Sequence, residues 1–202
     1  MQEPVTNRKY LFQEIFAIVV WFILFGLTVN LGLSHDLLSL YFDESGMIVG
    51  GVLLNFLGLI VLAVTHRSWT QDLVAVRQKS IYLLYLILLL AGISTLLHYH
   101  WTGLPAVYYL LFTTVSVIWQ DYITFGLLQN YLRQYLSFKL TLGLLPILFL
   151  LAHFCYVSQF AAKPLALLLT GLMAVFFTYL REKTQTLHGL FFCHLLFYFL
   201  TA

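Results

Sequence analysis

The stretch LPAVYYLLFTTVSVIWQDYITFGLLQNYL, residues 104–132, is an apolar run long enough to cross a bilayer, yet it carries Asp121 near its middle. A carboxylate at that depth costs several kcal/mol unless it is paired, hydrated or protonated, so its presence predicts a functional role. Two later apolar runs carry His153 and His194. We expect the rest of the chain to be a membrane frame that brings these three residues together.

The composition indicates a polytopic membrane protein. Of the 202 residues, 61% are hydrophobic and only 9% are charged, and the mean hydropathy is +0.91. Soluble domains carry about 25% charged residues. The net charge of +2 and the lack of a basic cluster argue against a nucleic-acid partner. The sequence therefore predicts an all-α membrane bundle, a single domain over residues 1–202, in the cell membrane.

Hydropathy predicts about seven membrane spans. The positive-inside rule orients them: with a cytoplasmic N-terminus, nine of the ten Lys and Arg residues fall on one side of the membrane and only Lys163 on the other. In the second span, Gly58 and the Gly50–Gly51 pair predict close contacts with neighbouring helices. The expected spans are residues 10–33, 47–65, 81–101, 104–132, 140–160, 164–180 and 187–201.

The three intramembrane polar residues are predicted to share one depth. Asp121, His153 and His194 each lie 11 to 14 residues from a basic residue at the cytoplasmic side. That separation is about 17 to 21 Å along a helix, close to the middle of a core about 30 Å thick. Each residue alone could be no more than an interhelical hydrogen-bond partner. The three together favour a polar cavity.

A metal site is the alternative use of these histidines, because Cys155 and Cys193 lie beside them. On a helix, however, residues two apart diverge by about 200° and adjacent ones by about 100°, so the His and Cys of each pair point apart. Thiols in apolar surroundings are usually inert. We therefore expect no metal and no cofactor.

Three segments carry a recognisable order of motifs: QDYITFG at 120–126, FLLAH at 149–153 and TLHGLFFCHLLFY at 186–198. In this order and spacing, residues 104–198 resemble the CAAX prenyl-protease/Abi (CPBP) family of intramembrane proteases, whose usual motifs are EExxxRG, FxxxH and HxxxN. The resemblance implies that His153 activates a water and that His194 stabilises the oxyanion. Tyr198 stands in place of the family Asn.

The first motif departs from the family pattern. Gln120 occupies the position of the first Glu, Asp121 that of the second, and Phe125 that of the Arg. An amide orients a water but does not accept its proton. Because Phe125 offers no charge, we expect Asp121 to be an unpaired carboxylate and a candidate general base.

These features leave more than one function open. The resemblance implies an endopeptidase that cleaves a membrane-associated peptide or protein through a base-activated water. Its site would comprise Gln120, Asp121, His153, His194 and Tyr198. The alternative is a catalytically degenerate member that acts as a bacteriocin-immunity or membrane-binding protein. A proton-coupled transporter or channel is disfavoured, because the sequence shows neither two similar halves nor proline inside the third and fourth spans.

Overall fold

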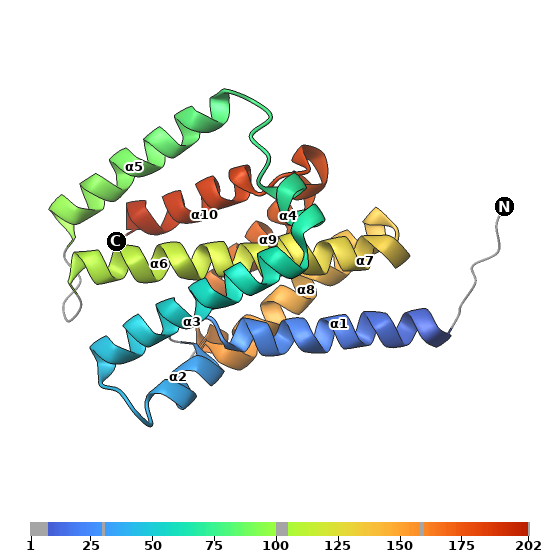
Figure 1. Ribbon diagram of the computed structural model, residues 1–202, viewed down its shortest axis with the longest axis horizontal. Coiled ribbons are helices and arrows are strands. Elements are labelled where there is room, and N and C mark those ends of the chain that lie inside the picture. Colours follow the sequence, from blue (N-terminus) through green and yellow to red (C-terminus); the bar gives the residue numbers. More distant parts are fainter. Residues whose placement is uncertain (1–7, 30, 100–104, 158–159, 202) are drawn as a thin grey trace.

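The computed structural model describes residues 8–29, 31–99, 105–157 and 160–201, and within these ranges it contains helices and no strand (Figure 1). The predicted all-α class is therefore confirmed. The helices are α1 (Arg8–Gly26), α2 (Gly32–Leu38), α3 (Glu44–Thr65), α4 (Arg67–Leu73), α5 (Ser80–His98), α6 (Ala106–Asp121), the π-helix η1 (Tyr122–Leu128), α7 (Gln129–Tyr135), α8 (Phe138–Tyr156), the 3₁₀ turn η2 (Phe160–Ala162), α9 (Pro164–Thr184) and α10 (His188–Thr201).

Five helical segments are long and apolar enough to cross a membrane: α3, α5, the continuous helix formed by α6, η1 and α7, α8, and α9. These five identify a multi-pass membrane protein. Two further apolar helices, Phe12–Gly26 and α10, are shorter. Five of the predicted spans lie on these five segments, and the first and last predicted spans lie on the two shorter helices, so the count of about seven spans stays a prediction. The first predicted span, residues 10–33, is too long at its C-terminal end, because α1 ends at Gly26 and a separate helix, α2, begins at Gly32.

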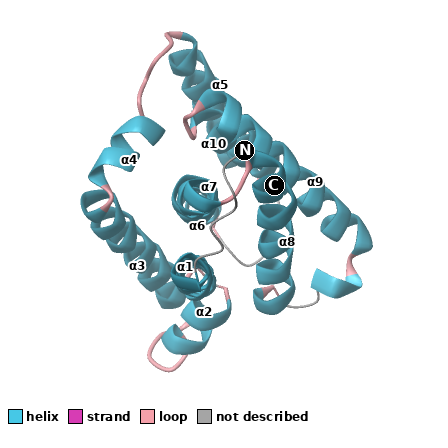
Figure 2. Ribbon diagram, turned by 90° about the vertical axis from the view of Figure 1, so that its right-hand side faces the viewer, coloured by secondary structure: helices cyan, strands magenta, loops and turns pink. Residues whose placement is uncertain are grey.

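The centre of the bundle is the continuous helix of α6, η1 and α7. Figure 2 looks almost along this helix and shows the other helices arranged around it. In its most apolar window 67% of the residues are buried, against 17% to 28% in the other four spans. The stretch that carries Asp121 is thus the core of the protein.

Small residues let the outer helices approach this centre, as predicted for the second span. A Cβ added to Gly58 of α3 would lie 2.7 Å from the Trp119 ring of α6. Trp119 in turn donates a hydrogen bond of 3.1 Å from Nε1 to the Leu24 carbonyl of α1. Gly58 therefore allows α3 to pack closely on the central helix.

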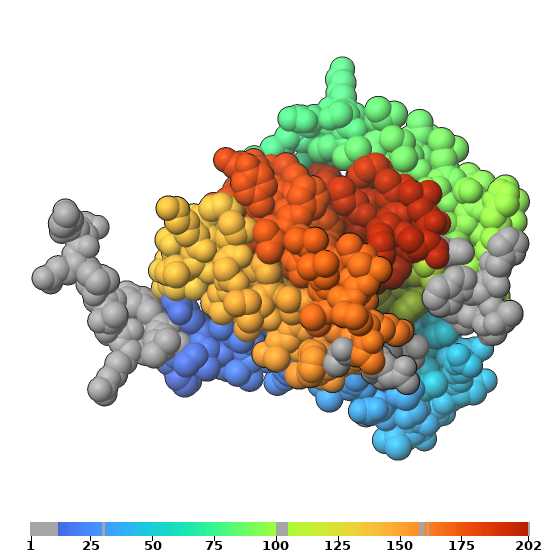
Figure 3. Space-filling view, turned by 180° about the vertical axis from the view of Figure 1, so that it is seen from behind, coloured from blue at the N-terminus to red at the C-terminus, as the bar shows by residue number. Residues whose placement is uncertain are grey.

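Helices α8, α9 and α10 form the face of the bundle that is seen from behind relative to Figure 1. Figure 3 shows α8, α9 and α10 together on this face, in orange to red. α8 and α9 pack along each other, and α10 packs against α5, α6 and α9. Figure 1 places the C-terminal end of α7 and the short helix α4 at one end of the bundle, with α2 at the other. With the exception of Lys163, the lysines and arginines of the described segments occur at the N-terminal ends of α1, α4 and α8, in the α4–α5 connection, and at the C-terminal ends of α7 and α9.

Candidate active site

A cavity of about 830 Å³ lies between α6, α8, α9, α10 and the turn after α1. Its walls are mostly aliphatic and aromatic. Four of the five site residues predicted from the sequence line it, namely Gln120, His153, His194 and Tyr198. Residues that are far apart in the chain, and that the sequence placed at one depth, therefore meet at one cavity.

Asp121 lies behind this cavity and does not line it. Its side chain is completely buried, and Oδ1 accepts a hydrogen bond of 3.0 Å from Nδ1 of His194. The expectation that Asp121 is unpaired was wrong, because α10 supplies the partner that its own helix lacks. The second carboxylate oxygen, Oδ2, is buried without a hydrogen bond to any described residue. His194 is 2% exposed and lines the cavity, so the pair is buried and borders the cavity only through the imidazole.

His153 is held by its own helix. Its Nδ1 lies 2.9 Å from the carbonyl oxygen of Phe149, four residues earlier. A carbonyl oxygen only accepts, so Nδ1 carries the hydrogen and Nε2 of the neutral ring keeps its lone pair. The ring is also packed against Phe25, Phe149 and Phe160, with centroid separations of 5.2, 4.4 and 5.4 Å. This packing fixes the orientation of a nitrogen that can accept a proton.

Gln120 reaches the cavity from the central helix. It is 7% exposed and has no hydrogen-bond partner among the described residues. Ser116, one turn earlier on α6, also lines the cavity, and its hydroxyl is buried without a described partner. No sequence motif singles out Ser116. Its position four residues before Gln120 was the available signal, since residues i and i+4 lie on one helix face.

The described residues contain no group of three His, Cys, Asp or Glu side chains placed to hold a metal ion. Cys155 is exposed, while Cys193 lines the cavity and is half-buried. The cavity groups that can donate, accept or move protons are therefore imidazole, amide, hydroxyl and thiol.

Comparison with known families agrees with the motifs. Residues 102–200 match the family model described as "Rce1-like: Type II CAAX prenyl endopeptidase Rce1-like". Over residues 102–200, the protein is therefore similar to the Rce1-like CAAX endopeptidase family. The comparisons with curated proteins and with solved structures found no match.

The structure explains how this chain accommodates Phe125 where the motif of the similar family has Arg. Phe125 is fully buried and packs against Phe149 at 5.5 Å and Phe177 at 5.6 Å between ring centroids. An aromatic cluster thus replaces the ion pair within the helix. The carboxylate of Asp121 pairs with His194 instead.

The backbone conformation changes within the QDYITFG motif at 120–126. The helix widens into a π-helix at Tyr122, directly after Asp121, and π-helical turns often occur at functional sites. Trp21 of α1 donates a hydrogen bond of 2.9 Å from Nε1 to Oγ1 of Thr124 within this segment. A Cβ added to Gly126 would lie 3.1 Å from Leu73 and 3.3 Å from Leu187. The motif glycine therefore admits these two side chains against the π-helix.

Tyr198 stands one turn after His194 on α10. Its ring stacks on the imidazole with centroids 5.4 Å apart and planes 29° apart. The family Asn is thereby replaced by a residue that contacts the same histidine. The phenol adds a hydroxyl at the cavity wall.

Proposed function

We propose that the protein is an endopeptidase of the cell membrane that cleaves a membrane-associated peptide with a water activated by His153. The observation that supports this most directly is that Gln120, His153 and His194 line one cavity in a chain that is similar to the CAAX endopeptidase family. The largely apolar walls suit a substrate that enters from the lipid. The polar groups on those walls suit the peptide bond.

In this proposal His153 is the general base. Its Nδ1–H is engaged by the Phe149 carbonyl, so Nε2 is the nitrogen that takes a proton from water. The side-chain oxygen of Gln120 accepts the other water hydrogen and orients the lone pair. The hydroxide oxygen bonds to the peptide carbonyl carbon, whose π electrons move to its oxygen. When the C–N bond breaks, His153 returns its proton to the leaving amine.

His194 would stabilise the carbonyl oxygen as it gains charge. In this role the carboxylate of Asp121 accepts the hydrogen bond from Nδ1–H of a protonated His194. The second ring nitrogen, Nε2–H, is then the donor to the carbonyl oxygen, and the carboxylate offsets the positive charge of the imidazolium. Asp121 is then a positioning residue rather than the base, because it does not line the cavity. Tyr198 fixes the imidazole plane by stacking.

The test is hydrolysis of a prenylated CAAX peptide by the protein purified in detergent. His153→Ala is expected to lose at least about a hundredfold in rate, in the range of general-base removal. Asp121→Asn keeps an acceptor for Nδ1–H but cannot offset an imidazolium charge, so it also loses about a hundredfold, in kcat more than in KM. Gln120→Ala costs less, and Gln120→Glu, which restores the family residue, increases the rate. Unchanged rates in folded His153→Ala protein would contradict the proposal.

A second candidate follows from the absence of a carboxylate among the described residues that line the cavity. Such a cavity also suits a family member that binds a peptide without cleaving it, as an immunity protein against a bacteriocin would. This function should survive in the double variant Asp121→Asn, His153→Asn, which keeps the shapes of both side chains. Full biological activity of the correctly inserted double variant would favour binding over hydrolysis.

A further inference from the structure

A second pocket, of about 370 Å³, lies at the end of the bundle where α7 and α9 end and where α4 and the connection to α5 pass. Its character is opposite to that of the first cavity. Three arginines reach it from three segments of the chain. The polar residues that line it include Asp72, Arg77, Asn130, Arg133, Arg181 and Gln185.

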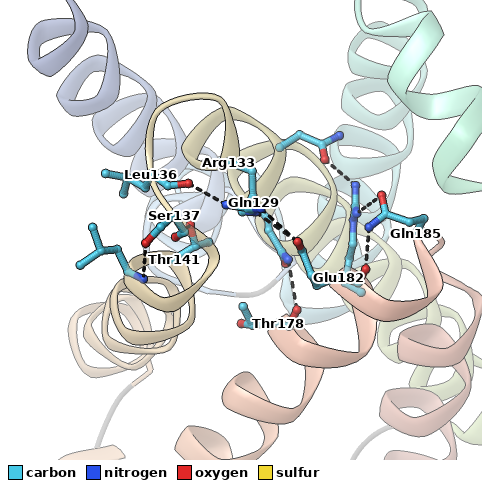
Figure 4. A network of polar contacts seen from close by, with 11 residues as sticks. Gln129, Arg133, Leu136, Ser137, Thr141, Thr178, Glu182 and Gln185 are labelled. Atoms are coloured by element: carbon cyan, nitrogen blue, oxygen red, sulfur yellow. Dashed lines mark hydrogen bonds and ion pairs between the residues drawn. The ribbon is translucent and has the colours of Figure 1, made fainter. Parts of the chain in front are cut away.

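Two of the three arginines have carboxylate partners. Arg133 forms two hydrogen bonds with Glu182 of α9, of 3.3 Å from Nε and 3.2 Å from Nη2 (Figure 4). Arg77 lies 3.6 Å from Asp72 of α4. The Arg133–Glu182 and Arg77–Asp72 ion pairs together carry no net charge. By themselves they would not attract a further ion.

Arg181 is the third arginine, and its partners are neutral. Nη1 donates a hydrogen bond of 3.2 Å to Oε1 of Gln185, and Nη2 donates to Oδ1 of Asn130. Its Nε is buried and has no partner among the described residues. Arg181 is only 5% exposed, and no described carboxylate lies within ion-pair distance of it.

This burial is not what the sequence indicates, since the expected span ends at residue 180 and leaves Arg181 outside it. In the structure it lies within α9, one turn before the helix ends at Thr184. A buried guanidinium needs a compensating negative charge, because desolvation of an unpaired ion costs several kcal/mol. The carboxylates of Asp72 and Glu182 act on Arg181 only from beyond ion-pair distance, and each already pairs with another arginine, so these five charged groups leave the pocket a net charge of +1.

We infer that this pocket binds one phosphate group, supplied by the phosphodiester of an anionic lipid. A phosphodiester carries a single negative charge, which matches the single unpaired cation. The planar guanidinium donates hydrogen bonds in the geometry that phosphate oxygens accept. The pocket also lies at the end of the bundle that carries nearly all the basic residues, and Trp69 lines it, as expected at the headgroup level. The inference does not depend on hydrolysis in the first cavity.

The test measures thermal unfolding of the full-length protein in a neutral detergent. Phosphatidylglycerol, with one phosphodiester charge, is titrated against zwitterionic phosphatidylcholine of the same chain length. A third titration uses sodium phosphate against sodium chloride at equal ionic strength. Phosphatidylglycerol is expected to raise Tm by several degrees, because a ligand of the folded state alone stabilises it. Phosphatidylcholine is expected to have little effect.

Arg181→Gln should weaken the response to phosphatidylglycerol at least about tenfold in apparent affinity, the usual consequence of losing a charged hydrogen-bond donor. Arg67→Gln is the matched control. Arg67 is an exposed arginine at the start of α4 that does not line the pocket, so this variant removes the same charge and should keep the wild-type response. If Arg181→Gln does not fold, Arg77→Gln at the half-exposed rim applies the same test with a smaller expected loss, of about threefold.

The outcomes separate the possibilities. Stabilisation by inorganic phosphate alone, lost in Arg181→Gln, would retain the anion site but assign it to a soluble phosphate. Equal responses of wild-type, Arg181→Gln and Arg77→Gln proteins would overturn the inference. So would a response of wild-type protein to phosphatidylcholine as large as that to phosphatidylglycerol. Peptidase activity is not the readout, so a failed hydrolysis proposal leaves this result interpretable.

Discussion

The central helix and α5 differ in a way that inverts the rule for soluble proteins. The central helix, Ala106–Tyr135, has a mean hydropathy of 1.2 and is the most buried span, whereas α5 has a mean hydropathy of 2.2 and is 17% buried. The least apolar of the five spans is thus the one inside. In lipid, outer surfaces accept aliphatic side chains freely, while polar groups must find partners within the protein. Polarity therefore marks the interior of this protein.

The largest expected effect concerns the buried Asp121–His194 pair at the centre of the bundle. Asp121→Ala leaves His194 buried without its carboxylate and is expected to destabilise the protein by about 3 kcal/mol, comparable to breaking other buried pairs. Unfolding by denaturing detergent, monitored by circular dichroism, measures this. The double variant Asp121→Leu, His194→Phe removes both polar groups and should recover much of the loss. A single variant as stable as wild type would show that the pair contributes no stability.

Leucine truncations compare the two helices directly. Leu128 on the central helix is 2% exposed. Leu128→Ala should lower the free energy of unfolding by about 2 kcal/mol, mainly because of the cavity that remains. Leu89 on α5 is 60% exposed, so Leu89→Ala should change the free energy of unfolding by less than about 0.5 kcal/mol. Equal losses in the same unfolding assay would contradict the assignment of α5 as an outer helix.

Close packing onto the central helix gives a similar or smaller effect. Gly58→Ala forces a methyl group against the Trp119 ring, 2.7 Å away, and should cost about 1 to 2 kcal/mol as α3 shifts. Gly143→Ala on α8 is the control, because an added Cβ there meets nothing within 4 Å. The quantity to compare is the change in Tm of the two variants. A larger loss at Gly143 would place the close helix contact elsewhere.

The ion pair between Arg133 and Glu182 at the end of the bundle should contribute least to the free energy of unfolding. Arg133 and Glu182 are 32% and 22% exposed, so water competes for both. Arg133→Gln is expected to cost about 1 kcal/mol or less, and the loss should shrink further in high salt. A loss as large as that of Asp121→Ala, insensitive to salt, would show that this end is as dry as the centre.

Much of the frame follows from the sequence. The run of apolar residues fixes where helices lie, because only a helix satisfies its own backbone in lipid. Counting residues from the basic flanks placed Asp121, His153 and His194 at one depth, since the rise per residue is constant. The same counting missed α2 and α4, which are too short and too polar to give a periodic signal.

The sequence by itself determined the membrane class, the order of the helices and the family motifs, because these depend on composition and spacing along one chain. Only the tertiary structure decided which groups face each other. His194 takes the place of the missing arginine as the partner of Asp121, the π-helix follows directly after that carboxylate, and Arg181 is buried at a polar pocket. The pairing of Asp121 and the burial of Arg181 depend on the rotation of one helix against another, and packing between helices sets that rotation.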